Sequence, residues 1–181
     1  MAEAGGELLG LITTVVFVVL VGYAGWIDLR TRRIPNWLTL GILLSGLILK
    51  ALLGLGPLAS GAIGAALGLT LAVVLFGLGA VGGGDGKLLI GVGAFFGYES
   101  FVGALLLIAV LGGLLGVFEA VRRGVILPAM FSAGGMIRRW LTLGRSGEKR
   151  TMESPGAVTV PYGVAIATGS IVWWFWGGPW P

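Results

Sequence analysis

Long hydrophobic runs, separated by short polar segments, make up most of the chain. Three runs, at residues 8–27, 37–55 and 58–81, are each long enough for a helix to cross a hydrocarbon core of about 30 Å. A fourth run covers residues 88–121 and is interrupted only by Tyr98, Glu99 and Ser100 and by Glu119. A last run, at residues 162–176, ends in a tryptophan-rich belt. This pattern predicts an all-α integral membrane protein.

The run at residues 88–121 is too long for one crossing and short for two. Lys87 lies at one end of it, and Arg122 and Arg123 lie at the other. Because Lys and Arg collect on the cytoplasmic side of membrane proteins, both ends face the cytoplasm and the number of crossings between them is even. We therefore interpret this run as two short helices that turn near Glu99, which predicts six transmembrane helices in total.

The positions of the cations then fix the expected orientation. In the six-helix interpretation, eleven of the twelve Lys and Arg residues lie on one side, and only Lys50 lies elsewhere. That side is cytoplasmic and both termini are external. Residues 122–160 form a basic cytoplasmic loop, with an amphipathic surface segment at 136–141 and a linker at 154–156. Anionic lipid accounts for such a cluster beside membrane spans, so no nucleic-acid partner is expected.

Composition narrows the class of protein further. Only 11% of the 181 residues are charged, whereas soluble domains carry about 25%, and the length suits a single domain, here membrane-embedded from residue 1 to 181. The absence of cysteine and histidine excludes thiol nucleophiles, disulfides, imidazole metal sites and Ser-His-Asp catalysis. Residues 1–7 are acidic and lack the positive segment of a cleaved signal peptide, so the first helix is expected to remain.

Two aspartates, Asp28 and Asp85, are the only ones in the chain, and both fall at the cytoplasmic boundary. A carboxylate at this depth costs free energy and therefore needs a partner or a role. A structural explanation is available for each: Asp28 can pair with the arginines that follow it, and Asp85 can be a turn residue paired with Lys87. Lys87 itself is either a cation that sets topology or a group that orients a carboxylate or a substrate carbonyl.

The functional explanation treats the two carboxylates as a pair. Peptide hydrolysis without a covalent intermediate needs one ionised carboxylate to take a proton from water and one protonated carboxyl to polarise the scissile carbonyl. Two carboxylates placed close together share one proton and titrate as a pair. Glycines such as Gly82 and Gly84 let backbone approach backbone, as an extended substrate requires. This chemistry needs no metal and no cofactor.

Three segments together resemble a known family, the type IV prepilin leader peptidases, which are membrane aspartic proteases with a Gly-x-Gly-Asp motif. The segments are DLRTRRIPN at 28–36, GGGDGKL at 82–88 and VPYGVAIA at 160–167. The likeness is greatest to the small, peptidase-only form used for tight-adherence pili. It implies an inner-membrane enzyme that removes the short basic leader of prepilins or pilin-like proteins, just before a hydrophobic helix. Asp28 and Asp85 are then general base and general acid, in an order that the resemblance leaves open.

Two departures from the larger family members limit what the resemblance implies. Those members carry an extra region with paired Cys-x-x-Cys motifs and also N-methylate the cleaved pilin, whereas this chain has no cysteine, so N-methylation is not implied. Gly86 stands where many members have a branched apolar residue. Two other functions stay open from the residues alone: a small transporter or channel subunit whose acids relay protons or bind a cation, and a non-catalytic assembly factor.

Overall fold

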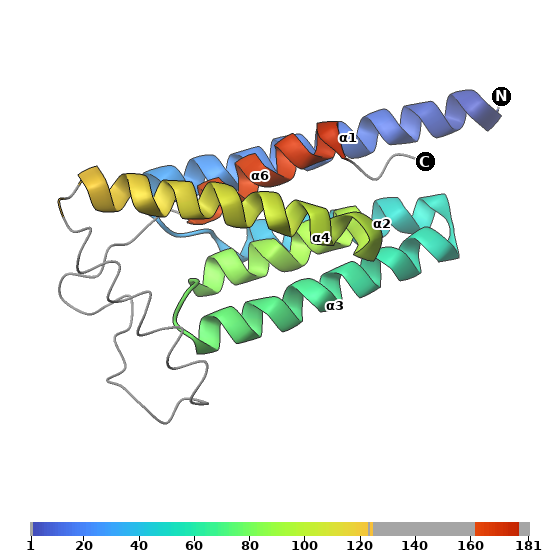
Figure 1. Cartoon of the computed structure of the whole chain (residues 1–181). Helices are drawn as coiled ribbons and strands as arrows, with labels where there is room; N and C mark the ends of the chain where they lie inside the picture. Colours follow the sequence, from blue (N-terminus) through green and yellow to red (C-terminus); the bar gives the residue numbers. More distant parts are fainter. Residues whose placement is uncertain (1, 123, 125–161, 178–181) are drawn as a thin grey trace.

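The computed structural model describes residues 2–122, 124 and 162–177, and every regular element among them is a helix (Figure 1). The helices are α1 (Ala2–Thr31), α2 (Asn36–Leu53), α3 (Leu55–Gly77), α4 (Gly83–Arg122) and α6 (Tyr162–Trp176). Four of them, α1 to α4, are long and apolar enough to cross a membrane. The all-α membrane prediction is therefore confirmed. The segments predicted at 136–141 and 154–156, with nearly all of the basic loop, lie outside the described residues.

The helices extend further into the polar segments than the hydrophobic runs predict. Asp28 lies inside the last turn of α1, and Asp85 lies in the first turn of α4, although the glycines around Asp85 indicate a loop. A helix satisfies its own backbone hydrogen bonds, which favours helical backbone close to the hydrocarbon region. Both carboxylates are thus carried by helix ends, which hold them more firmly than a loop would.

Helix α4 is two helical segments that run in opposite directions. Gly97 interrupts it with φ 73° and ψ 173°, a left-handed conformation that glycine adopts without steric cost. The first segment begins at Gly83 and ends at Gly97, and the second segment runs back toward α1, where Glu119 lies beside Arg32 (Figure 1). The charge pattern predicts a turn near Glu99, and the chain reverses two residues before it.

Polar side chains from three helices surround this reversal. Ser60 of α3 donates a hydrogen bond to the Glu99 carboxylate, and Lys50 of α2 lies close enough for its charge to act on Glu99. A Cβ atom at Gly97 would contact the Ser60 hydroxyl and lie 3.3 Å from the Lys50 ammonium. Glycine is therefore required here for space as well as for its backbone conformation.

Glycines also allow α3 to pack directly on the first segment of α4. Gly64 and Gly93 face each other, and a Cβ on either one would overlap the backbone of the other helix. At Gly68, one turn away, a Cβ would lie 2.8 Å from the backbone oxygen of Leu89 and 3.0 Å from Cα of Ile90. Small residues are the usual means by which helices approach closely in membranes, where no hydrophobic effect drives them together. This contact fixes the register of α4, and with it the position of Asp85.

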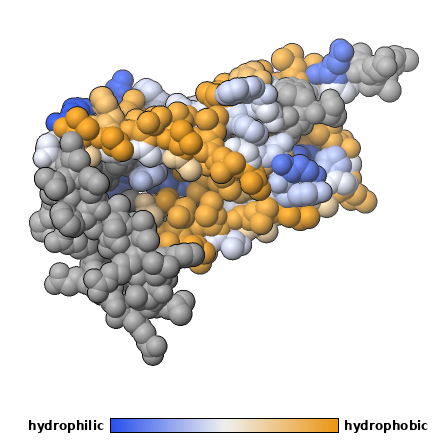
Figure 2. Space-filling model, viewed as in Figure 1, coloured by the Kyte–Doolittle hydropathy of each residue, from blue (hydrophilic) through white to orange (hydrophobic). Residues whose placement is uncertain are grey.

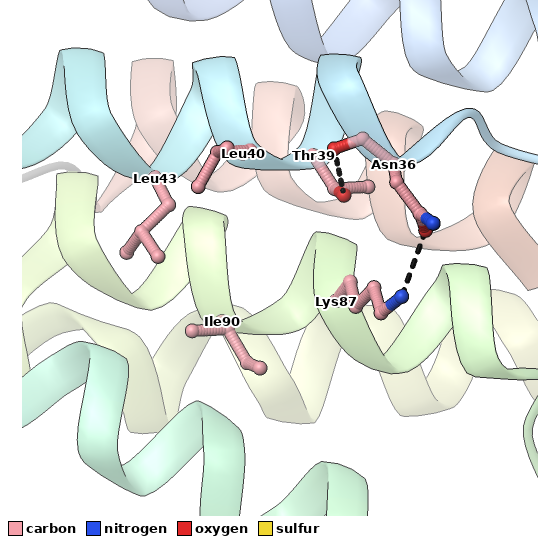
Figure 3. A pocket seen from close by; sticks show the side chains of 6 residues that line it. All are labelled: Asn36, Thr39, Leu40, Leu43, Lys87 and Ile90. Carbon is pink, nitrogen blue, oxygen red and sulfur yellow. Dashed lines mark hydrogen bonds between the residues drawn. The ribbon is translucent and has the colours of Figure 1, made fainter.

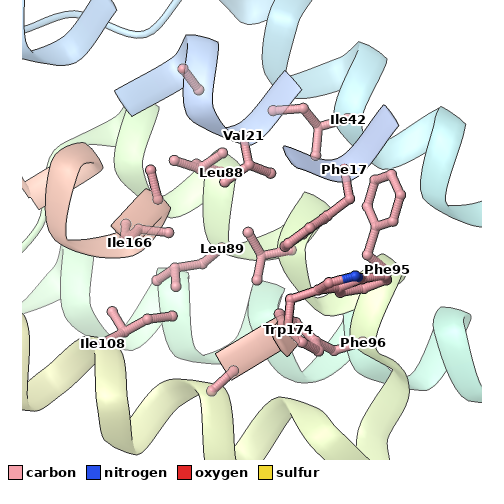
Figure 4. Close-up of a cluster of buried hydrophobic side chains, with 14 of the residues drawn as sticks. Phe17, Val21, Ile42, Leu88, Leu89, Phe95, Phe96, Ile108, Ile166 and Trp174 are labelled. Carbon is pink, nitrogen blue, oxygen red and sulfur yellow. The ribbon is translucent and has the colours of Figure 1, made fainter. Parts of the chain in front are cut away.

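The core lies where α1, α2, α4 and α6 meet. Phe17 stacks on Trp174 with ring centroids 4.3 Å apart, and Phe95 and Phe96 pack around that pair (Figure 4). Many other large apolar side chains face outward, and hydrophobic residues cover much of the face shown in Figure 2. Such a surface suits contact with lipid tails rather than water.

Candidate active site

The two aspartates meet at one end of the helical bundle. Asp28 is almost fully buried at the end of α1, with 4% of its surface exposed, and Asp85 is half-buried at the start of α4. The two carboxyl groups are close enough for the charge of Asp28 to act directly on Asp85. Helices α2 and α3 form an antiparallel pair between them, which returns the chain to the level of Asp28.

The first turn of α6 completes this site. The amide of Gly163 lies within hydrogen-bonding reach of both carboxyl groups, and the amide of Val164 lies within reach of Asp28. Amides in the first turn of a helix have no partner within the helix, and the helix dipole favours negative charge at that end. A Cβ atom at Gly163 would lie 2.8 Å from Cγ of Asp28, so only glycine lets α6 come this near.

One oxygen of Asp28 keeps its hydrogen-bonding capacity unused. Its Oδ2 atom is buried and has no hydrogen-bond partner among the described residues. Buried polar atoms are normally satisfied, and an exception at a paired carboxylate is where a substrate or a water molecule would supply the missing bond. The geometry is therefore compatible with a carboxylate that accepts a proton.

Gly82 and Gly84 bring the backbone close to both aspartate segments. The amide of Gly82 lies within reach of the Asp85 carboxyl group, and a Cβ there would lie 3.2 Å from Oδ2 of Asp85. Gly84 packs on Ile34, whose backbone nitrogen and oxygen would both be 3.4 Å from a Cβ at Gly84. The segment that follows Asp28 therefore rests directly on the segment that contains Asp85.

Lys87 contacts a neutral partner in the described part of the chain. Its Nζ atom donates a 2.7 Å hydrogen bond to the Oδ1 atom of Asn36, at the start of α2 (Figure 3). This bond joins the two aspartate-bearing segments a second time. Asn36 belongs to a motif that the resemblance singles out, but the sequence alone assigns it no role, because its partner lies 51 residues away.

A pocket of about 270 Å³ opens beside this bond. Its lining comes from α2 and from the first segment of α4 and consists of Asn36, Thr39, Leu40, Leu43, Lys87 and Ile90 (Figure 3).

An ion pair adjoins the site on its other side. The guanidinium of Arg32 lies 3.9 Å from Glu119, and Arg122 lies 4.0 Å from the same carboxylate. Arg32 adopts a left-handed conformation, with φ 52°, that ends α1, and its charge also acts on Asp28. Glu119 could have been noticed in the sequence, because the six-helix interpretation places it at the same depth as the two aspartates.

Together these contacts hold two carboxylates around a common point, with backbone amides against both. Such a pair can share one proton, so that one member acts as a base and the other as an acid. Within the described residues, no third Asp, Glu, His or Cys joins them as a metal ligand would.

Comparison with known proteins supplies an independent finding. The family model described as the type IV leader peptidase family matches residues 15–117, a range that contains Asp28, Asp85 and Lys87. A prepilin leader peptidase/N-methyltransferase of Aeromonas salmonicida (strain A449) is 34% identical over 119 residues, 62% of this chain and 40% of the relative. A protein of the same name from Aeromonas hydrophila is 33% identical over 124 residues, covering 65% and 41%. The chain thus spans about 40% of the length of these relatives, and no solved structure matches.

Proposed function

Because the chain belongs to the type IV leader peptidase family, we propose that it is an aspartic endopeptidase that cleaves the leader from prepilins or pilin-like proteins. It is a multi-pass protein of the inner membrane. The proposed substrate is a membrane-anchored precursor whose short basic leader lies in the cytoplasm, just before a hydrophobic helix. The observation that carries the proposal is the approach of Asp28 and Asp85 to the same amide, that of Gly163.

In the proposed mechanism, Asp28 and Asp85 share the work of hydrolysis. The ionised carboxylate takes a proton from a water molecule while the water oxygen bonds to the scissile carbonyl carbon. The protonated carboxyl gives its proton to the carbonyl oxygen, which yields a neutral tetrahedral diol. The carbon–nitrogen bond then breaks: the nitrogen receives a proton from the first carboxyl, and the second recovers one from the diol. No metal or cofactor takes part in this scheme.

We further propose six membrane crossings with both termini external. The reversal of α4 at Gly97 supports two crossings within that helix. Helices α1 and α6 pack antiparallel, because Gly163 adjoins Asp28 and Trp174 donates a hydrogen bond to Thr14. This packing supports an external position for both the start of α1 and the end of α6. The distribution of Lys and Arg supports a cytoplasmic location for the two aspartates.

The relatives are also named as N-methyltransferases. We expect no such activity from the residues of this chain, because the family resemblance associates it with paired cysteines, and this chain has none. The ion-relay alternative is not favoured by membership of a peptidase family.

The test is cleavage of a prepilin by purified protein in detergent, followed as a mobility shift on a gel. Asp28→Asn and Asp85→Asn should each reduce the cleavage rate at least a thousandfold while membrane insertion stays normal, because an amide keeps the shape but cannot exchange the proton.

The matched control is Glu99→Gln, a carboxylate at the other end of the bundle whose amide replacement can still accept the hydrogen bond from Ser60. It should keep cleavage within about threefold of wild type. Substantial turnover by either aspartate variant would exclude the two-carboxylate mechanism.

A further inference from the structure

The pocket between α2 and the first segment of α4 has a polar end and an apolar end. Asn36 and Lys87 form the polar end, and Leu40, Leu43 and Ile90 form the apolar end (Figure 3). The hydroxyl of Thr39, which also lines it, donates to the Asn36 carbonyl oxygen at 3.0 Å. The apolar end therefore offers hydrophobic contact, and the hydrogen-bonding capacity still available is at the polar end.

Position links this groove to the two aspartates. Lys87 bonds to Asn36, which lies two residues after Ile34, and Ile34 rests on Gly84, the residue before Asp85. From Asn36 to Leu43 the lining residues follow α2 for about two turns, roughly 10 Å at 1.5 Å per residue. The Asn36–Lys87 end of the groove thus adjoins the two segments that carry the aspartates, and the apolar lining continues from there along Leu40 and Leu43.

Charge selects which part of a substrate fits. Lys87 is the one charged residue among the six that line the groove, and its hydrogen bond goes to a neutral amide. A basic segment placed here would be repelled, whereas an apolar segment that offers a carbonyl or carboxylate oxygen at its start would complement the ammonium. The leader and the hydrophobic helix of the proposed substrate differ in this respect, so they cannot exchange places.

We propose that this groove binds the apolar segment that directly follows the scissile peptide bond, with an oxygen acceptor of that segment at Lys87. This inference rests on the proposed function and adds the direction in which the substrate lies. The basic leader lies away from the groove, and the first apolar side chains after the scissile bond lie in it, along the outer surface of the α2–α4 contact.

The experiment places a tryptophan side chain in the groove. The control places the same side chain at a similarly exposed position of α2 outside the groove. Leu40 is 54% exposed and lines the groove, whereas Ile48 is 58% exposed two turns later and does not line it. With a prepilin as substrate, Leu40→Trp should raise KM about tenfold and leave kcat within about twofold. Ile48→Trp should leave both unchanged. Equal KM values for the two variants would overturn the groove assignment.

Two further results separate the possible failures. If wild-type protein does not cleave a prepilin at all, the proposed function fails; if it cleaves and Leu40→Trp cleaves with unchanged KM, only the groove fails. In nanodiscs, the tenfold ratio of the KM of Leu40→Trp to that of wild type should be the same in phosphatidylglycerol and in phosphatidylcholine. A KM defect that vanishes in phosphatidylcholine would assign the groove to an anionic lipid and overturn the proposal.

Cross-linking provides a measurement that does not depend on kinetics. The chain contains no cysteine, so single cysteines report one position each. In an Asp85→Asn background, Leu43→Cys should form a disulfide with a cysteine in the first two turns of the pilin helix, and Ile48→Cys should not. Equal linking at both positions, or none at Leu43→Cys, would contradict the proposed path.

Discussion

At the scale of single residues, the sequence predicts the aspartates and the glycines beside Asp85, but not the groups that reach them from distant helices. Asp28 and Asp85 stand out because they are the only two and fall at one predicted depth. Gly163 and Asn36 contact them or their neighbours only after helices far apart in the chain have packed. Periodicity and spacing describe neighbours along the chain, so they cannot identify such partners.

Gly163 is important because it has no side chain, which leaves room for the carboxyl group of Asp28. Gly163→Ala would place a methyl group 2.8 Å from Cγ of Asp28, so either the carboxylate or α6 must move. We expect kcat/KM for prepilin cleavage to fall at least tenfold, measured in the gel assay, because the proposed mechanism uses the carboxylate that is displaced.

The control for that substitution is Gly116→Ala in the second segment of α4, where a Cβ meets nothing within 4 Å. It should retain full activity and stabilise the helix by about 0.5–1 kcal/mol. Wild-type kinetics in Gly163→Ala would show that the approach of α6 to Asp28 is not needed.

At the scale of elements, the contact between α3 and the first segment of α4 carries the second aspartate. The abundance of glycine predicts close helix packing in general. It does not say which glycines pair, because the chain has 35 and many, such as Gly77 and Gly113, face open space. The packing register that places Gly64 opposite Gly93 is seen only in the folded bundle.

Gly64→Ala should separate these two helices. Its methyl group would overlap the backbone of Gly93, and overpacking of this kind costs about 1–3 kcal/mol. We expect a lower midpoint of thermal unfolding in detergent and reduced cleavage, because α4 carries Asp85.

Gly77→Ala changes the last residue of the same helix, where an added Cβ meets no atom within 4 Å. It serves as the reference and should not unfold below the wild-type temperature. If Gly64→Ala matches it, the close contact between α3 and α4 does not determine stability.

At the scale of the whole molecule, charge is the most informative part of the sequence. It predicts the reversal near Glu99, which hydrophobicity alone leaves ambiguous. Lys50 is the one cation that the prediction places away from the cytoplasmic side. Its position has a physical reason, because its aliphatic chain packs over Gly61 and its charge acts on Glu99 at the turn. The bounds of the helices were less predictable, because helical backbone continues past the ends of the hydrophobic runs.

Orientation across the membrane is tested by labelling single cysteines in intact cells. Thr31→Cys, at the end of α1 beside the aspartates, should react with a membrane-impermeant thiol reagent only after the cytoplasmic face is opened. Gly6→Cys, near the other end of α1 and without atoms nearby, should react from outside. Labelling of Thr31→Cys in intact cells would invert the proposed orientation.

The position of Gly163 has a consequence for biosynthesis. A ribosome delivers the helices in chain order at about 5–20 residues per second, so both aspartates leave it several seconds before α6 does. During that interval Asp28 lacks the amides of Gly163 and Val164, and Asp85 has the amide of Gly82 but not that of Gly163. The site is therefore complete only after α6 has been made. We expect the proposed peptidase activity to begin only when synthesis has passed α6.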